Sequence, residues 1–189
     1  MLKKTLLSLV LFSGSTFAYE TLNIVPELSS VSFTTIKKQY VIEPAVVEDI
    51  KGQYSNNTFN ISIDFNSVDT GVSIRNDRIN QLFLKTNLYP LVKVQGNFDL
   101  ESMKGPITKT SIKADVDFYG RIKTYEIPVI IHKTNEITTV NSYKPIIVKA
   151  SDFGIPKENL INLAATVGGL TISDTVPLNI NLTFKAAAK

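Results

Sequence analysis

Residues 59–65 read FNISIDF, and this short stretch decides the class of fold. Apolar side chains at Phe59, Ile61, Ile63 and Phe65 alternate with the polar side chains between them. Successive side chains of a β-strand point to opposite faces, so a period of two predicts a strand with one buried and one solvated face. Such half-buried strands are typical of antiparallel sheets.

The same alternation returns along the rest of the chain. Weaker versions of it cover residues 31–36, 46–54, 91–98, 136–142 and 146–150. Turn-forming residues separate these segments, and eight or nine short strands at this spacing predict an all-β, antiparallel barrel or sandwich. The clearest further rows are Ile112, Ala114, Val116 and Phe118; Tyr125, Ile127, Val129 and Ile131; and Val176, Leu178, Ile180, Leu182 and Phe184.

Two segments break the alternation and predict short helices. Residues 77–88 and 157–168 carry apolar side chains at helical spacing. Asn76 or Asp77 can cap the first helix, and Gly168 follows the second. Both segments are apolar enough to lie against the open end of a barrel, so we expect them to form a lid over it.

The first 18 residues have the three parts of a secretory signal peptide. Lys3 and Lys4 precede an apolar run over residues 6–12, and small side chains at Thr16 and Ala18 precede a cleavage point. The apolar run is too short to cross about 30 Å of hydrocarbon, which needs about 20 residues. We therefore expect residues 1–18 to be removed, a single domain over residues 19–189, and a periplasmic or secreted protein.

Composition excludes several classes of function. The chain has 20 Lys and Arg against 17 Asp and Glu, and removal of the signal peptide brings the two signs almost into balance. Its longest basic run is Lys37-Lys38, so we expect no binding of nucleic acid. The absence of cysteine excludes thiolate metal sites and cysteine nucleophiles. A single histidine, His132, excludes a three-histidine centre, and we expect neither a metal nor another cofactor.

The apolar interior is the remaining candidate for a functional site. A barrel of about eight strands is just wide enough to be filled by its own side chains or to hold one small ligand. Alternation of apolar residues does not separate a packed core from a ligand cavity, so both interpretations stay open at this point.

Five blocks of sequence, taken in order, carry a resemblance to a known family. They are Leu28-Ser29-Ser30-Val31-Ser32-Phe33; Ile50-Lys51-Gly52-Gln53-Tyr54; the group formed by Ser67-Val68-Asp69-Thr70-Gly71, Arg75-Asn76-Asp77-Arg78-Ile79 and Tyr89-Pro90-Leu91-Val92-Lys93-Val94; Ser151-Asp152-Phe153-Gly154; and Ile172-Ser173-Asp174-Thr175-Val176. Together they resemble the YceI-like periplasmic proteins over essentially the whole chain that follows the signal peptide. Two residues depart from the family pattern, since Leu28 replaces the usual His and Ala114 stands where Gly is usual.

The resemblance implies an extended, lipocalin-like antiparallel β-barrel that holds a long polyisoprenoid or similar amphiphilic chain in its interior. It also implies frequent homodimers and no established catalysis. Each buried methylene of a ligand contributes about 0.8 kcal/mol, so a chain of about a dozen carbons can bind through the hydrophobic effect alone. Such a site needs no motif of polar residues.

The inward-facing rows and the predicted lid give the candidate ligand contacts. A polar head group is expected near Arg75, Asn76 and Arg78, beside the first helix. The expected lid contacts are Ile79, Leu82, Phe83 and Leu88. The expected wall contacts are Phe33, Ile61, Ile63, Val92, Val94, Ile112, Ala114, Val116, Phe118, Ile127, Val129, Leu178 and Ile180.

Two other classes of function compete with a lipid carrier. A barrel or sandwich with a solid core would act as an interaction module, with exposed apolar patches and no cavity. An enzyme acting on a bound lipid would need a polar group among the inward rows, and Tyr125 is the one residue that could supply it.

Overall fold

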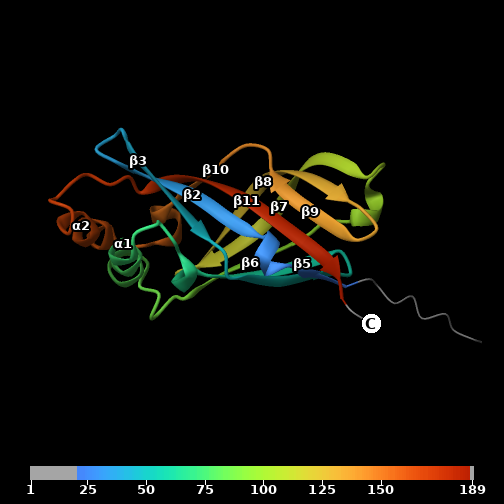
Figure 1. Ribbon diagram of the computed structural model, residues 1–189, viewed down its shortest axis with the longest axis horizontal. Helices are drawn as coiled ribbons and strands as arrows, with labels where there is room; N and C mark the ends of the chain where they lie inside the picture. Colours follow the sequence, from blue (N-terminus) through green and yellow to red (C-terminus); the bar gives the residue numbers. More distant parts are fainter. Residues whose placement is uncertain (1–20, 188–189) are drawn as a thin grey trace, which may run out of the picture.

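The structure, a computed structural model, describes residues 21–187 (Figure 1). The predicted signal peptide over residues 1–18 and the expected first mature residue, Tyr19, lie outside the described residues. The strands are β1 (Leu22–Ile24), β2 (Ser30–Lys37), β3 (Val41–Val47), β4 (Ile50–Ser55), β5 (Thr58–Asp64), β6 (Leu91–Asn97), β7 (Ile107–Phe118), β8 (Arg121–Lys133), β9 (Ile137–Ser142), β10 (Ile146–Lys149) and β11 (Thr175–Ala186). The helices are α1 (Ser73–Arg78), the π-helical η3 (Ile79–Leu84), α2 (Lys157–Ala165) and the 3-10 turns η1 (Pro26–Leu28), η2 (Phe65–Ser67), η4 (Leu100–Ser102) and η5 (Ala150–Phe153).

Eight of these strands close into an antiparallel barrel, as the sequence predicts. Hydrogen-bonded neighbours follow the order β1-β4-β5-β6-β7-β8-β9-β11, and β11 pairs with β1 to complete the ring. Closure pairs the backbone groups that an open sheet would leave free at its edges. Figure 1 shows this barrel from the side, with its long strands running obliquely between the two ends.

The last strand, β11, is shared between two parts of the barrel. Its C-terminal half pairs with β1 and β9, whereas its N-terminal half pairs with β2 and β10. The hairpin of β2 and β3 therefore extends the barrel beyond the eight-stranded ring, towards the end where the helices lie (Figure 1). A bridge between Val46 and Asp69 holds the hairpin to the segment that leads into α1.

Tight turns set the register of two hairpins, β4–β5 and β7–β8. Asn56 and Asn57 have φ of 50° and 60° between β4 and β5, and Tyr119 and Gly120 have φ of 53° and 75° between β7 and β8. Two-residue turns with both φ angles positive match the right-handed twist of the flanking strands. They place the apolar rows of neighbouring strands on the same inner face of the sheet.

One predicted strand is in fact two. Residues 46–54 were expected to form a single strand, but the chain bends at Glu48 and Asp49 and divides there into β3 and β4. The Ile50 amide donates to the Glu48 carbonyl at 2.9 Å, and the Asp49 amide donates to Ser67 Oγ at 3.1 Å. Before this bend β3 pairs with β2, and after it β4 pairs with β5. The short strand β1 has no alternating pattern of its own and was not predicted.

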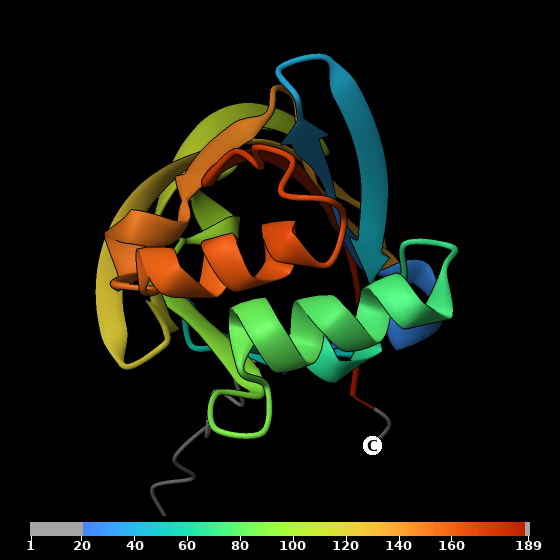
Figure 2. The ribbon, with the colours of Figure 1, turned by 90° about the vertical axis from the view of Figure 1, so that its left-hand side faces the viewer.

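The two short helical regions cross one end of the barrel, which we call the mouth (Figure 2). Both were predicted, although the first begins at Ser73 instead of Asp77 and ends at Leu84 instead of Leu88. Lys85 adopts the left-handed conformation, with φ of 54°, and so stops the helix there. Among the described residues no helix combines the length and the apolar character needed to cross a membrane.

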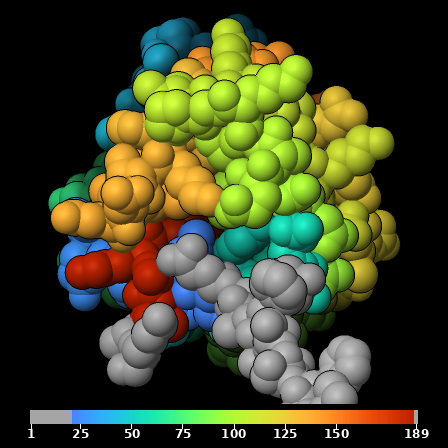
Figure 3. All heavy atoms as spheres, turned by 90° about the vertical axis from the view of Figure 1, so that its right-hand side faces the viewer, coloured from blue at the N-terminus to red at the C-terminus, as the bar shows by residue number. Residues whose placement is uncertain are grey.

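The other end, which we call the base, holds both ends of the described chain. The Ala187 amide donates to the Thr21 carbonyl at 2.9 Å. Side chains of the segment around residues 100–110, and of the loop between β8 and β9, cover much of this end in Figure 3. Mouth and base therefore differ in construction, because helices cross one and strand ends and loops cover the other.

Candidate functional site

An apolar cavity of about 470 Å³ occupies the interior of the barrel. It extends from Leu22, Tyr54 and Leu100 at the base to residues of α1, η3 and α2 at the mouth. Ligand pockets in proteins span roughly 300–1,000 Å³, and dry cavities are those lined by apolar side chains. The barrel is therefore hollow. The alternative of an interaction module with a solid core predicted a barrel without a cavity.

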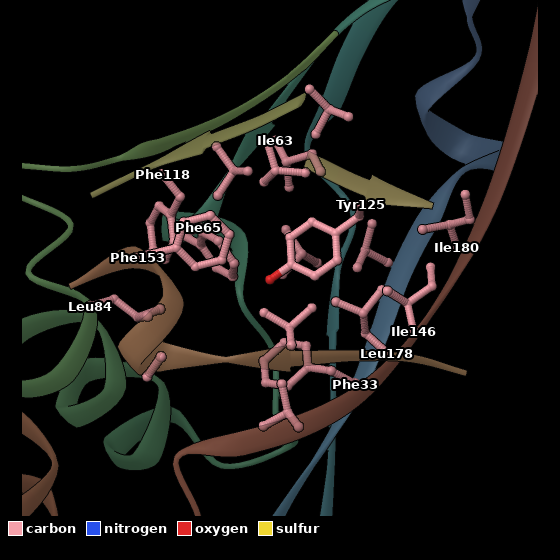
Figure 4. Close-up of a pocket in the computed structure, with 18 of the residues that line it drawn as sticks. Phe33, Ile63, Phe65, Leu84, Phe118, Tyr125, Ile146, Phe153, Leu178 and Ile180 are labelled. Atoms are coloured by element: carbon pink, nitrogen blue, oxygen red, sulfur yellow. The ribbon is translucent and has the colours of Figure 1, made fainter. Parts of the chain in front are cut away.

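The wall of this cavity is built from the inward-facing rows of the barrel strands. Figure 4 shows side chains of β2, β5, β7, β8, β10 and β11 directed towards a common space. Most of the predicted wall residues line it, namely Phe33, Ile61, Ile63, Val92, Val94, Ile112, Val116, Phe118, Ile127, Val129, Leu178 and Ile180. These residues come from strands that lie far apart in the sequence, so barrel closure brings them together.

Ala114 is the exception among the wall residues. It lies in the inward row between Ile112 and Val116, but its side chain is only 1% exposed and does not reach the cavity. Its neighbours across the sheet are Gly96 and Tyr125. Because the Tyr125 ring is far larger than a methyl group, it forms the wall at this level. The sequence-based placement of Ala114 in the wall is therefore wrong.

Aromatic side chains gather on the wall near the mouth. The rings of Phe118 and Phe153 pack edge to face with centroids 5.6 Å apart, and Phe65 lies 5.2 Å from Phe118 (Figure 4). Phe153 belongs to the block Asp152-Phe153-Gly154, which resembled a family motif without an assigned role. In the structure Phe153 is buried against the cavity, and Gly154 adopts φ of 67° to end η5. This block thus forms part of the wall.

Tyr125 brings a polar atom to the wall, and that atom has a partner. Its hydroxyl donates to Asp152 Oδ2 at 3.2 Å, while Lys123 Nζ lies 2.9 Å from Asp152 Oδ1. Burial, followed by the nearby negative charge of Asp152, raises the pKa of Tyr125 to about 12. The hydrogen bond from Lys123 lowers the pKa of Asp152 below its ordinary value. The phenol is therefore held protonated, which makes it a poor base and a poor nucleophile at neutral pH.

The lid contacts differ in part from the prediction. Ile79 and Phe83 line the cavity, together with Leu84, which was not assigned to the lid. Leu82 is half-buried outside the cavity lining, and Leu88 is 66% exposed. Both were expected to close the mouth, and both predictions are wrong. The π-helical turns of η3 bring Ile79, Phe83 and Leu84 to one face, whereas an ordinary helix over residues 77–88 would have turned Leu88 inwards.

Arg75 and Arg78 line the mouth of the cavity, but Asn76 does not. The side chain of Asn76 instead fixes the turn before α1. Its Oδ1 accepts from the Thr70 amide at 3.0 Å and from the Thr70 hydroxyl at 2.6 Å, and its Nδ2 donates to Asp69 Oδ1 at 3.2 Å. The assignment of Asn76 to a head-group site is therefore wrong, because its hydrogen-bonding groups are used within the protein.

The sequence interpretation missed two charged residues of the β2–β3 hairpin that line the cavity. Lys37 and Glu43 lie on the β2–β3 hairpin, line the cavity and form an ion pair with each other. Arg75 Nη2 lies 3.2 Å from Glu43 Oε1, so the carboxylate is shared between two cations. Thr35 and Glu43 are directly opposite in the hairpin register, and both face inward. A continuous inward row through Phe33, Thr35 and Lys37 was the signal that could have found this cluster.

Asn159 connects the two halves of the lid. This residue of α2 is buried, and its Nδ2 donates to the Phe83 carbonyl at 2.9 Å and to the Tyr119 hydroxyl at 3.1 Å. Arg78 Nη1 adds a long hydrogen bond of 3.4 Å to the Thr166 carbonyl. A polar residue in the first turn of a short helix gave no sign of this role in the sequence.

No group of three or more His, Asp or Glu residues suitable for a metal ion occurs within residues 21–187. His132, the one histidine, lies exposed near the end of β8. Apart from the charged cluster at the mouth, the cavity offers mainly apolar contacts. Its chemistry is that of a container for an apolar chain.

Comparison with known proteins supports this description of the fold. The model of a family described as YceI-like domain matches residues 17–184. The structure is similar to that of a polyisoprenoid binding domain from Saccharophagus degradans implicated in plant cell wall breakdown, with a TM-score of 0.81, 24% identity, and coverage of 90% of this chain and 99% of that one. It is also similar to Burkholderia cenocepacia BcnA, with a TM-score of 0.62, 16% identity, and coverage of 85% and 98%. No curated protein matches the sequence significantly.

Proposed function

Since this chain belongs to the YceI-like family, we propose that it carries a long-chain isoprenoid or a similar amphiphilic lipid inside its barrel. The apolar cavity that extends from the base to the mouth is the observation that carries this proposal. The similar domain from Saccharophagus degradans is described as polyisoprenoid-binding, which supports the same class of ligand.

The energetics of a long chain agree with such a role. Twelve buried methylenes contribute about 10 kcal/mol at about 0.8 kcal/mol each. Association itself costs an estimated 4–15 kcal/mol in lost freedom of motion. A chain of about a dozen carbons therefore only begins to bind, and each further methylene raises affinity about fourfold. A long apolar cavity therefore selects for long chains without any motif of polar or catalytic residues.

We place the protein outside the cytoplasm, in the periplasm or beyond it, because residues 1–18 have the pattern of a signal peptide. The mature chain should begin at or near Tyr19, and N-terminal sequencing of the exported protein tests this directly. An exported protein that still begins with Met1 would overturn this part of the proposal. The family resemblance implies a homodimer. This stays a prediction, and measurement of the protein's mass in solution tests it.

We also propose that the protein binds its ligand without transforming it. Tyr125 is the inward-facing residue considered for catalysis, and its proton is held by Asp152 at 3.2 Å. Recovery of a chemically unchanged lipid after prolonged incubation would agree with a carrier. Turnover of the bound lipid that stops in Tyr125→Phe would overturn this statement.

Binding of a series of prenyl alcohols tests the carrier role. Geraniol, farnesol and geranylgeraniol differ by one five-carbon unit each and carry the same neutral head. We expect affinity to rise by at least about tenfold with each unit, because every unit buries further apolar surface. Equal affinities across the series, or no binding at all, would contradict an apolar-chain carrier. Native mass spectrometry of the purified protein tests the same point by detecting a lipid that co-purifies.

A further inference from the structure

Apolar side chains are exposed to solvent on three elements that surround the mouth. Tyr40 and Ile42 of the β2–β3 hairpin are 77% and 65% exposed. Val72 and Ile74, at the start of α1, and Ile161 of α2 are also exposed. Figure 2 shows the hairpin, α1 and α2 together at this end of the barrel. We call these five residues the rim. Single exposed apolar residues are ordinary, but a group of them around one opening is a mark of an interaction surface.

The rim is continuous with the lining of the cavity. Val72 and Ile74 line the cavity and are exposed to solvent at the same time. On α2, Leu160 lines the cavity next to the exposed Ile161. Along both helices, an apolar surface therefore runs from the outside of the molecule into the barrel. A hydrocarbon chain can follow this surface inwards.

The tip of the hairpin is an ordered part of the rim. Lys38 and Gln39 have φ of 50° and 68°, and the Tyr40 amide donates to the Lys37 carbonyl at 3.2 Å. The Lys38 amide donates to the Thr171 carbonyl at 2.9 Å, on the segment that follows α2. The turn therefore holds Tyr40 in its exposed position. Contact with another surface does not have to order the backbone of this turn first.

The same three elements carry more positive than negative charge. Within residues 37–43, 73–78 and 157–165, the basic residues are Lys37, Lys38, Arg75, Arg78 and Lys157, and the acidic residues are Glu43, Asp77 and Glu158. Lys38 and Lys157 are exposed, and Lys157 lies one helical turn before Ile161 on α2. Lysine and tyrosine side chains beside aliphatic ones are typical of surfaces that lie at a membrane–water interface.

We propose that the rim docks on a lipid bilayer that contains anionic lipids, and that the protein exchanges its ligand with the bilayer while docked. This inference rests on the carrier function proposed above and adds the partner from which the carrier takes its ligand. Each methylene lowers the concentration of a chain in water about fourfold relative to an apolar phase. A carrier that waits for dissolved ligand therefore loads slowly, whereas one that holds its open end against a bilayer takes up the chain directly.

A second copy of the chain is the competing occupant of the rim, through the edge strand β3. The order of paired strands ends with β3, so one of its edges has no neighbouring strand. Part of that edge is already used, because Val46 bridges Asp69. Pro44 also lies in β3, and a proline in an edge strand opposes pairing with a further strand. These features favour a bilayer over a sheet continued between two copies.

The absence of tryptophan from the sequence allows a direct test of docking. In the purified mature protein, Tyr40→Trp introduces one indole at the hairpin tip, and Ile107→Trp introduces one at the base. We add vesicles of an equal mixture of phosphatidylcholine and phosphatidylglycerol. The emission of Tyr40→Trp should shift to shorter wavelength, and that of Ile107→Trp should stay unchanged. Lys38→Glu in the Tyr40→Trp protein should weaken the binding of these vesicles, because anionic lipids attract the lysine.

Two outcomes of the fluorescence test would overturn docking at the rim. One is an equal shift in both variants, or no shift in either. The other is a shift in Tyr40→Trp that appears without vesicles and grows with protein concentration, because a second copy would then cover the rim.

Transfer of geranylgeraniol separates docking from ligand binding. Its rate of uptake from the same vesicles should rise in proportion to vesicle concentration, because collision limits the rate. Ile42→Glu should slow uptake about tenfold or more, since the apolar contact of one isoleucine is lost. Ile107→Glu is the matched control, since Ile107 is 63% exposed at the base, and it should leave the rate unchanged. Neither residue lines the cavity, so both variants should keep their affinity for geranylgeraniol added from ethanol.

The two proposals fail in different ways. Uptake that is independent of vesicle concentration, or unchanged in Ile42→Glu, would overturn docking and leave the carrier intact. Failure of the unmodified protein to bind geranylgeraniol added from ethanol would overturn the carrier, and with it the exchange of ligand at the bilayer.

Discussion

The two ends of the barrel close the same cavity by different means. At the base, the Tyr54 hydroxyl donates to the Phe98 carbonyl at 3.0 Å and accepts from the Leu100 amide at 3.3 Å, within a ring of paired strands. At the mouth, two short helical regions cover the opening, and Asn159 links them through its Nδ2 group. Strand ends and loops that are hydrogen-bonded to the barrel strands close the base, whereas two helical regions outside the sheet cover the mouth.

This difference assigns separate tasks to the two ends. Backbone ladders and buried apolar side chains open only when much of the fold opens with them. Helices that pack on a cavity bury fewer apolar contacts and can separate at lower cost. Charged residues are also gathered at the mouth, where Lys37, Glu43 and Arg75 meet. We therefore expect the base to stabilise the barrel and the mouth to be the end at which a ligand enters.

The largest effect is expected from a matched pair of leucine truncations. Leu100 is buried at the base, whereas Leu163 on α2 is half-buried at the mouth. Leu100→Ala should lower the free energy of unfolding by about 2–5 kcal/mol, because buried leucines leave cavities when truncated. Leu163→Ala should cost less than about 2 kcal/mol, because its side chain is only partly withdrawn from water. Denaturant unfolding measures both, and equal losses would contradict the division of tasks.

A second pair of substitutions separates the wall of the cavity from the packed sheet around it. Ala114→Trp places an indole where no space exists, between Gly96 and Tyr125, and should cost about 1–3 kcal/mol or more. Ile180→Trp instead projects into the cavity, so the protein should stay folded and lose its affinity for geranylgeraniol. Unfolding midpoints together with ligand titrations test this. An Ile180→Trp variant that binds normally would place the ligand elsewhere.

The lid offers a smaller, kinetic effect. Asn159→Ala removes two hydrogen bonds that join α2 to η3 and to Tyr119. Loss of about 1 kcal/mol from each of the two bonds should speed the release of bound geranylgeraniol by up to about thirtyfold. Stopped-flow displacement measures this rate. Tyr54→Phe at the base is the comparison, since it should lower stability and leave the release rate unchanged. Faster release in both variants would mean that the base also opens.

The sequence predicted the architecture because alternation is a strong and local signal. FNISIDF fixes which face of β5 is buried. The turn at Asn56 fixes the register of β5 with β4, and the turn at Tyr119 fixes the register of β7 with β8. The break at Glu48 was missed because apolar residues continue on both sides of it. The end of the first helix was also missed, since neither the π-helical turns nor the left-handed Lys85 has a sequence signature. Local patterns reveal strands, while the points where a chain changes partners depend on tertiary contacts.

The site was predictable to the extent that it consists of strand faces. Ile63, Val129 and Ile180 reach the cavity because every second residue of a barrel strand faces inward. Ala114 shows the limit of this reasoning, since facing inward does not ensure contact with a cavity when a larger neighbour covers the residue. The pairing of Glu43 with Arg75 joins a hairpin to a helix, and no sequence period connects those two elements. Contacts between elements had to come from the structure.

The smallest expected effect is on the pH dependence of stability, through the ionisation of one tyrosine at each end of the barrel. Burial raises the pKa of both Tyr54 at the base and Tyr125 near the mouth, but their hydrogen-bond partners differ. The Leu100 amide donates to Tyr54 Oη and so favours its charged form, whereas Asp152 accepts from Tyr125 Oη and disfavours it.

The result for Tyr125 is a pKa of about 12, above the ordinary value of 10. Because its proton is bound more tightly in the folded state, its contribution to stability is complete below pH 10 and is lost as pH rises towards 12. Tyr125→Phe should therefore make the free energy of unfolding less dependent on pH between 10 and 12, as followed by denaturant unfolding at each pH. Tyr54→Phe is the control and should leave the alkaline loss largely in place. An unchanged alkaline slope in Tyr125→Phe, or an equal flattening in Tyr54→Phe, would show that the carboxylate of Asp152 does not hold the phenol proton.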